Sequence, residues 1–254
     1  MRGMRRLSIQ AVLGALALAA ANTASASDVT SVSGSQPLTV EDAYPTGAGT
    51  VGVEASFRWD RERGGTNLFE PDAQIKWGAA EKLQLSLGVP YRFGSTSSRD
   101  SGQVAVDALY QLTDDRDWLP ATALSPGIAF PLGLQEGTET SLSFLATKSL
   151  TGSRSGPAVH LNVTWYHMIA GGSAQRTDRY EVVVGYSHPV GPATSLIFDV
   201  VREQDRTKGQ VTNLVEVGIR RQIAEKAVFS IGAGAGIGDA SPIARVVAGV
   251  QQSF

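Results

Sequence analysis

Cysteine is absent from this chain of 254 residues. Without thiols, the protein has no disulfide framework, no thiolate metal site and no cysteine nucleophile. Charge is sparse and nearly balanced, because 22 basic side chains stand against 24 acidic ones and the net charge is −2. Nucleic-acid-binding proteins normally carry a clear basic surplus, so this balance argues against nucleic acid as a partner.

Long apolar runs are also scarce. An apolar run near the N-terminus covers 11–21, follows three arginines and precedes the small residues Ala24, Ser25 and Ala26. This layout is typical of a secretory signal peptide, which we predict over 1–26. A short N-terminal membrane helix is the alternative, but the run is too short to span about 30 Å of hydrocarbon. No later stretch approaches the roughly 18 consecutive apolar residues that a transmembrane helix needs.

The rest of the chain alternates apolar and polar residues. From Val51 to Asp60, apolar side chains interleave with glycine or polar ones. Successive side chains on a strand point to opposite faces, so this pattern predicts a strand with one apolar face and one polar face. Helices are not expected, because the apolar positions do not recur at a spacing of 3.6 residues. The same alternation recurs over 72–77, 83–93, 103–111, 159–165, 180–186, 196–200, 215–220, 229–236 and 244–251.

Two further segments show the pattern less clearly. One lies over 140–150, and the other, over 119–131, contains three prolines that cannot donate to a sheet ladder. With both included the chain has about twelve strands, an even number typical of bacterial outer-membrane barrels. We therefore predict an all-β fold, an antiparallel transmembrane β-barrel over 48–254 with both termini in the periplasm. The segment over 27–47 either hangs in the periplasm or forms a short plug.

The connections and the aromatic residues fit such a barrel. Short connections over 78–82, 188–194 and 222–226 alternate with longer polar ones, as expected for tight periplasmic turns opposite external loops. Aromatic residues on the apolar face fall into two bands, which predicts interface girdles. The outer band holds Trp59, Tyr91, Phe93, Trp165 and Tyr180, and the periplasmic band holds Trp77, Tyr110, Tyr186 and Phe254.

A soluble β-sandwich is the main alternative, because its strands also alternate but turn their apolar set into a core. The signal peptide, the aromatic bands and the terminal Phe254 favour the barrel. A terminal aromatic on a last amphipathic strand resembles the sorting signal of outer-membrane barrels. We therefore expect the bacterial outer membrane as the location, with the lipid bilayer and the outer-membrane assembly machinery as partners.

Catalytic and cofactor sites are not expected. The glycine run over 232–238 lacks the third glycine of a dinucleotide fingerprint, since Ile237 stands in its place, and no helix pattern follows. No histidine pair has metal-ligand spacing, so neither a metal nor a cofactor is predicted. An outer-membrane hydrolase would need a nucleophile bonded to a base, for example Ser143 with His160. A histidine satisfied by polar neighbours in the lumen is preferred, so no catalytic residue is predicted and the protein is not expected to be an enzyme.

The polar strand faces carry the residues that we predict to line the lumen. Charges of both signs could pair across the barrel and seal it, leaving a structural or surface-interaction protein. Alternatively, they set the field of a small polar pore. The predicted lining residues are Glu54, Arg58, Asp72, Lys76, Arg92, Asp107, Glu181, Asp199, Glu216, Arg220 and Arg245. Apolar residues face inward as well, which would suit amphipathic or aromatic solutes; they are Leu109, Leu145, Val183, Ile197 and Leu214.

Several stretches resemble a known family. They cover 42–50, 78–91, 119–133 and 161–163, and consist of turns and strand starts. Over roughly 40–254 the chain resembles the bacterial outer-membrane transporters named after the meta-pathway of phenol degradation. The resemblance implies an outer-membrane barrel that passes or binds small molecules, aromatic ones among them. It brings no catalytic residues.

Overall fold

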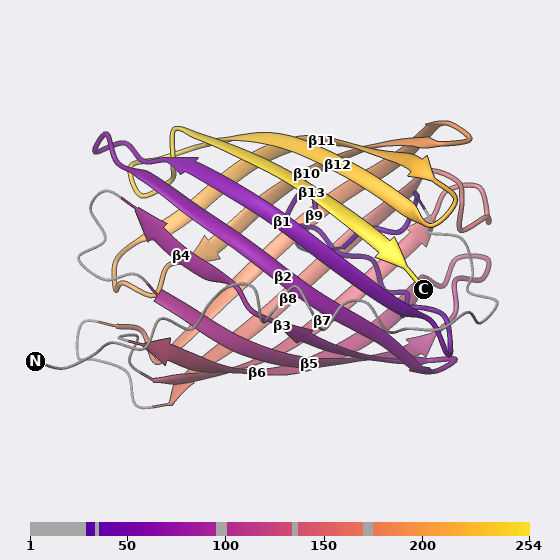
Figure 1. Cartoon of the computed structure of the whole chain (residues 1–254), viewed down its shortest axis with the longest axis horizontal. Helices are drawn as coiled ribbons and strands as arrows, with labels where there is room; N and C mark the ends of the chain where they lie inside the picture. The colour runs from indigo at the N-terminus through magenta and orange to yellow at the C-terminus, as the bar shows by residue number, and fades with distance from the viewer. Residues whose placement is uncertain (1–28, 34–35, 95–100, 134–136, 170–174) are drawn as a thin grey trace, which may run out of the picture.

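A computed structural model describes residues 29–33, 36–94, 101–133, 137–169 and 175–254, so the predicted signal peptide lies outside the described residues (Figure 1). Within these ranges, no helix has the length and apolar character needed to cross a bilayer. The described residues form thirteen strands: β1 (Val51–Arg61), β2 (Asn67–Ala80), β3 (Leu83–Gly88), β4 (Tyr91–Gly94), β5 (Ser101–Thr113), β6 (Ala121–Gly133), β7 (Thr138–Ser149), β8 (Ala158–Ile169), β9 (Asp178–Gly191), β10 (Thr194–Gln204), β11 (Val211–Ala224), β12 (Ala227–Gly236) and β13 (Ala244–Ser253).

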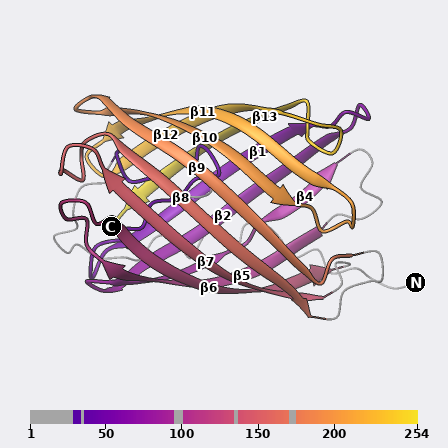
Figure 2. The ribbon, with the colours of Figure 1, turned by 180° about the vertical axis from the view of Figure 1, so that it is seen from behind.

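The strands close into one antiparallel barrel, whose far wall is seen in Figure 2. The first strand pairs with both β2 and β13, which closes the ring. Both β3 and β4 lie between β2 and β5, so thirteen strands fill twelve positions around the barrel. The prediction of an all-β antiparallel barrel of about twelve strands is confirmed.

Proline explains the split between β3 and β4. The sequence predicts one strand over 83–93, but Val89 and Pro90 lie outside both strands. Pro90 has no N–H to give to the ladder. Its carbonyl still accepts the N–H of Gln103 at 3.1 Å, so the chain keeps its course along the wall and strand geometry resumes at Tyr91.

The proline-rich segment forms a strand despite its missing donors. Pro126 lies inside β6 and faces outward. The β5–β6 ladder pairs Asp107 with Gly127 and next pairs Tyr110 with Leu124, so it lapses opposite Pro126 and resumes in the same register. On its other edge β6 pairs with β7 through the proline without a break. The long neighbouring ladders therefore compensate for the lost hydrogen bond.

Burial is the reverse of that in a soluble sandwich. Large apolar residues lie exposed on the outer wall, for example Val184 at 56% and Val200 at 54% exposure. Charged residues lie buried inside, with Arg220 at 0% and Glu216 at 2%. In a sandwich the apolar set would form the core. The observed distribution suits a barrel with lipid outside and a polar interior.

The two rims of the barrel differ in their connections. We name the rim with the connections over 62–66, 205–210 and 237–243 the loop end, and the rim with Phe254 the turn end. Two-residue turns over 81–82, 192–193 and 225–226 lie at the turn end, as the sequence predicts. The predicted strict alternation is wrong elsewhere, because the hairpins over 114–120 and 150–157 are long and share this rim. Asp115 of the first hairpin pairs with Lys148 and accepts the N–H of Ser149 at 3.0 Å, which ties this hairpin to the end of β7.

Candidate channel interior

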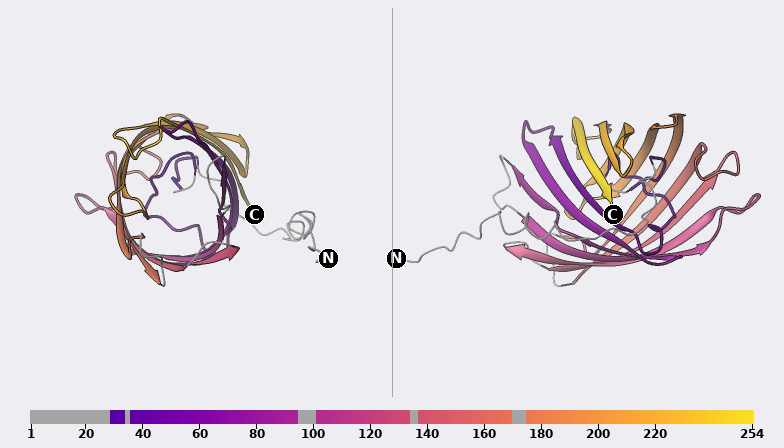
Figure 3. Two further views of the ribbon diagram at one scale, coloured as in Figure 1. Left: turned by 90° about the vertical axis from the view of Figure 1, so that its left-hand side faces the viewer. Right: turned by 45° about the vertical axis from the view of Figure 1, so that its right-hand side comes forward.

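The described residues before the first strand, 29–33 and 36–50, lie inside the barrel, where the end-on view in Figure 3 shows them curling along the inner wall. We name 29–33 and 36–50 the inner segment. Its hydrogen bonds reach β1, β13, β12, β11, β10, β8, β7, β3 and β2 in that order as the chain proceeds toward Thr50. The inner segment therefore follows the circumference of the barrel instead of crossing it once.

Gln36 begins this path with its side chain buried. Its amide nitrogen donates to the carbonyls of Ala55 and Val250, each at 3.2 Å, and its amide oxygen accepts the Ser230 hydroxyl at 3.3 Å. The carbonyl of Gln36 accepts Arg220 Nη1 at 3.1 Å. One side chain thus contacts the first strand, the last strand and β12.

Two carboxylates hold the next residues. Asp199 Oδ2 accepts the backbone N–H of Val40 at 2.9 Å, and Glu216 Oε2 accepts the Thr39 hydroxyl at 2.7 Å. Asp199 and Glu216 are direct cross-strand partners on β10 and β11, and only 3% and 2% of their surfaces are exposed. These strand carboxylates satisfy donors of the inner segment instead of standing free in the lumen.

The next residues of the inner segment form backbone hydrogen bonds with polar side chains of the wall. Glu41 donates its N–H to Asn162 Oδ1 and accepts Asn162 Nδ2 at its carbonyl, both at 2.8 Å. The N–H of Ala43 reaches the Thr147 hydroxyl at 3.0 Å. Thr46 donates its N–H to Gln84 Oε1 at 2.9 Å. Side chains on the wall therefore take up backbone groups of the inner segment that would otherwise be buried without partners.

Glycines on the inner face make room for the inner segment. A Cβ on Gly232 would lie 2.7 Å from both Leu38 Cδ2 and the carbonyl oxygen of Pro37. A Cβ on Gly218 would lie 2.5 Å from Pro37 Cγ. The glycine run over 232–238 thus starts with a position where only a residue without a side chain allows this approach.

Apolar residues of the inner segment cover the apolar part of the wall. Val32, Leu38 and Val40 form one buried cluster whose wall residues are Val183, Ile197, Val201 and Leu214. Ala43 and Tyr44 pack on a second cluster that includes Leu109 and Leu145. The interpretation of Val183, Ile197 and Leu214 as a solute-facing surface is wrong, because the inner segment occupies that surface. Leu109 and Leu145 retain an edge on a cavity.

The inner segment lies between two cavities. One of about 260 Å³ opens toward the turn end and is lined by Thr50, Ser149 and Ser253 among others. One of about 760 Å³ opens toward the loop end and is lined by charged residues such as Arg58 and Glu139. Four residues line both cavities, and we name them the constriction: Ser33, Glu41, Lys76 and Gln84.

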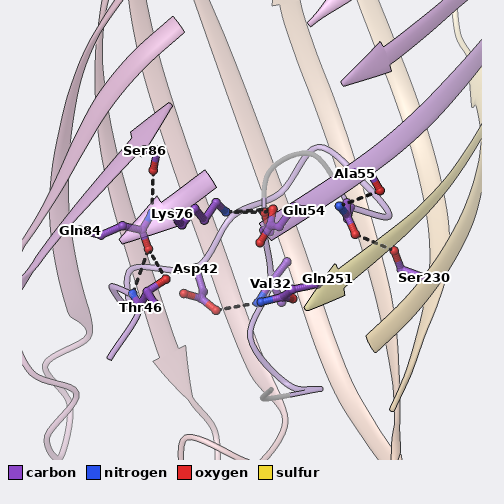
Figure 4. A network of polar contacts seen from close by, with 12 residues as sticks. Val32, Asp42, Thr46, Glu54, Ala55, Lys76, Gln84, Ser86, Ser230 and Gln251 are labelled. Carbon is purple, nitrogen blue, oxygen red and sulfur yellow. Dashed lines mark hydrogen bonds and ion pairs between the residues drawn. The ribbon is translucent and has the colours of Figure 1, made fainter. Parts of the chain in front are cut away.

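Lys76 is fixed at the constriction by two partners (Figure 4). Its Nζ lies 2.6 Å from Ser33 Oγ and 3.2 Å from Glu54 Oε2. The Ser33 hydroxyl in turn donates to Glu54 Oε2 at 2.8 Å. Lys76 and Glu54 are 7% and 2% exposed, so the base and the acid neutralise each other where the inner segment meets β1 and β2.

Ion pairs line the larger cavity near the loop end. Arg58 and Arg92 share Glu70, at 2.6 and 2.8 Å. Arg245 Nε lies 2.8 Å from Asp60 Oδ1. On the opposite wall the guanidinium of Arg179 lies between Glu139 and Glu203, and stacks 3.7 Å above the Tyr166 ring.

Three members of these pairs precede the predicted strand starts, and a fourth, Glu203, follows the predicted end of its strand at 200. The predicted strands begin at 72, 140 and 180, whereas the structure extends them back to include Glu70, Glu139 and Arg179. All three lie on the inner face that the alternation defines. Extending the pattern by one or two residues at each strand start would have found them.

The predicted lining residues separate into two groups. Arg58, Arg92, Arg245, Asp107 and Glu181 line the larger cavity, and Lys76 lines both. In the second group, Glu54, Asp199, Glu216 and Arg220 contact the inner segment. Asp72 stands four residues before Lys76 on the same face of β2.

The hydrolase pair expected as an alternative is not formed. Ser143 Oγ lies 2.9 Å from Thr164 Oγ1, and His160 Nε2 lies 2.9 Å from Ser187 Oγ. The second ring nitrogen of His160 contacts the Thr147 hydroxyl at 3.0 Å. Within the described ranges, no group of three or more acidic or histidine side chains is arranged to hold a metal ion.

Aromatic residues of the predicted girdles lie on the outer wall near the two rims. At the loop end Phe69 stacks with Phe93 at 5.4 Å between ring centroids and lies 6.0 Å from Phe57. Trp165 is 48% exposed and pairs in register with Tyr180. Phe69 is an unpredicted member of this group, since it falls in the early part of β2 that the sequence pattern missed.

Comparison with known proteins places the fold. The sequence matches no family model and no curated protein. The structure is similar to an outer membrane channel from Pseudomonas putida F1, with a TM-score of 0.62 and 14% identity over 84% of this chain and 98% of that one. It is also similar to the KdgM porin, with a TM-score of 0.55 and 12% identity over 79% of this chain and 99% of that one. A third similar fold is the translocator domain of the autotransporter NalP from Neisseria meningitidis, with a TM-score of 0.52 and 13% identity over 82% and 89% of the two chains. The fold is that of outer-membrane β-barrels.

Proposed function

We propose that this protein is a narrow outer-membrane channel for small polar molecules, whose bore is set by the inner segment. The observation that carries the proposal is the pair of cavities that share the constriction as a common lining. Together the cavities reach from the loop end past the inner segment toward the turn end. Two of the similar folds are an outer membrane channel and a porin, which supports transport over catalysis.

The chemistry of the interior favours polar solutes. Charged side chains dominate the larger cavity, and much of the apolar wall is covered by the inner segment. The KdgM porin has been observed in complex with oligogalacturonate, which supports a polar solute for a barrel of this architecture. We also propose that the protein belongs to the outer-membrane transporter family named after the meta-pathway of phenol degradation. In that case small aromatic molecules would be among the solutes, and they would contact Leu109 and Leu145 in the larger cavity.

The orientation follows from the two rims. We place the turn end with Phe254 in the periplasm and the loop end outside, after removal of a signal peptide over 1–26. The N–H of Phe254 donates to the carbonyl of Val51 at 2.8 Å, so the terminal aromatic lies where the barrel closes. This position supports recognition of the last strand by the outer-membrane assembly machinery.

A sealed barrel is the second candidate, and the many contacts of the inner segment favour it. Conductance in planar bilayers separates the two. The channel proposal predicts small, steady currents from the intact protein, and larger currents after deletion of 29–46, because the two cavities would merge. A silent intact protein with a conducting deletion variant would establish the sealed barrel. Silence from both, in folded protein shown by heat-dependent gel migration, would contradict a channel.

A further inference from the structure

The larger cavity carries a surplus of acid. Nine acidic and six basic residues line it among the described residues. Every one of the six bases lies in an ion pair with an acid, as Lys76 does with Glu54. In contrast, Glu41, Asp107 and Glu181 form no ion pair within the described part of the chain. Unpaired acids in a low-dielectric cavity raise the local concentration of cations.

The constriction contains two charged residues, one acidic and one basic. Lys76 and Glu41 both line the two cavities, but the charge of Lys76 is neutralised by Glu54 at 3.2 Å. The backbone of Glu41 is fixed by its two bonds to Asn162, each 2.8 Å long. Glu41 is therefore the charged residue of the constriction that has no ion-pair partner in the described part of the chain.

We propose that Glu41 is the selectivity-determining residue of the passage and makes it prefer small cations over anions. This inference rests on the proposed channel function and adds the class of ion that passes. A fixed charge at the narrowest point of a pore acts as charged rings do in channel selectivity filters. Lys76 opposes this preference only to the extent that Glu54 fails to neutralise it.

The preference depends on pH. Burial inside the barrel raises the pKa of the Glu41 carboxyl to about 7, so the carboxyl loses its charge as the pH falls through neutrality. The charged groups around it are Lys76 on β2, Glu54 on β1, Asp107 on β5 and Asp42 of the inner segment. Raising the pH from 6 to 8 should therefore increase the preference for cations.

The test uses the full-length protein in planar bilayers under a tenfold KCl gradient, with the reversal potential giving the permeability ratio of K⁺ to Cl⁻. The intact protein should prefer K⁺ several-fold at pH 8. Glu41→Gln should lower the ratio and reduce its change between pH 6 and 8, while Asp107 and Glu181 keep a smaller preference for K⁺. Lys76→Gln should raise the ratio, because it leaves Glu54 unpaired. The control Glu225→Gln removes an exposed acid in a turn-end connection and should leave the ratio unchanged.

The outcomes separate this inference from the channel proposal. Currents that prefer Cl⁻, or a ratio that Glu41→Gln leaves unchanged, would overturn the role of Glu41 and leave the channel standing. No current from any folded variant would overturn the channel itself. If Glu41→Gln did not fold, Glu41→Ala would replace it, and an unchanged ratio and pH response in that variant would count against the proposal.

Discussion

The middle of the lumen and its loop end satisfy their charges in different ways. In the middle, Asp199, Glu216 and Arg220 bind groups of the inner segment and are almost fully buried. At the loop end, Arg92 and Glu70 pair with each other, and the Arg92 side chain remains 50% exposed. Water can replace a lost partner at the loop end but not in the middle. Removing an inward-facing charge should therefore cost more stability in the middle of the lumen than at the loop end.

Arg220→Ala should cause the largest loss of stability, because it removes a buried charge from the middle of the lumen. Arg220 is 0% exposed and donates to the Gln36 carbonyl and, at 2.6 Å, to Gln251 Oε1. Arg220→Ala leaves two buried acceptors without a donor, which costs about 1–3 kcal/mol for each. Urea unfolding in lipid vesicles, followed by tryptophan fluorescence, should show a loss of this size. A loss below about 1 kcal/mol would mean that water reaches the middle of the lumen.

Gly232→Val should have an intermediate effect, because it removes space instead of a charge. Overpacking a filled interior costs about 1–3 kcal/mol, and the new side chain would collide with Pro37 and Leu38. The inner segment should then become accessible to protease while the barrel stays folded. The matched control is Gly64→Ala in a loop-end connection, where a Cβ would meet nothing within 4 Å. Equal protease resistance in the two variants would contradict a close fit between the inner segment and the wall.

Arg92→Gln should have the smallest effect. Exposed ion pairs contribute about 0–1 kcal/mol, and Glu70 keeps Arg58 at 2.6 Å when Arg92 is gone. The same urea titration should therefore place this variant within about 1 kcal/mol of the intact protein. A loss as large as that of Arg220→Ala would show that the loop end is as dry as the middle.

The wall of the barrel could be predicted from sequence because its signal is local. Alternation places Arg58, Asp107 and Glu216 on the inner face with no knowledge of their neighbours. Partner choice could not be predicted in this way. Arg245 meets Asp60 across the closure of the barrel, 185 positions apart in the chain, and only the register of β1 with β13 brings them together.

The sequence left the segment over 27–47 open between a periplasmic extension and a short plug, and its path could not be predicted for a different reason. Its residues follow a curved wall and show neither the two-residue period of a strand nor the 3.6-residue period of a helix. No local sequence pattern therefore marks them. The signal was present in the wall, where Gly218, Gly232 and Gly249 open space on the inner face. Glycine at these positions is compatible with a close neighbour, but the sequence does not reveal that this neighbour is the inner segment.

Gln36 adds a consequence for how the barrel is completed. The two strands that meet last in sequence, β1 and β13, form the final junction of the ring. Gln36 donates to Ala55 on one side of that junction and to Val250 on the other. Its binding position does not exist until both strands have met. Gln36 can therefore make both bonds only once the ring is closed, so the inner segment reaches its full set of contacts no earlier than β1 pairs with β13.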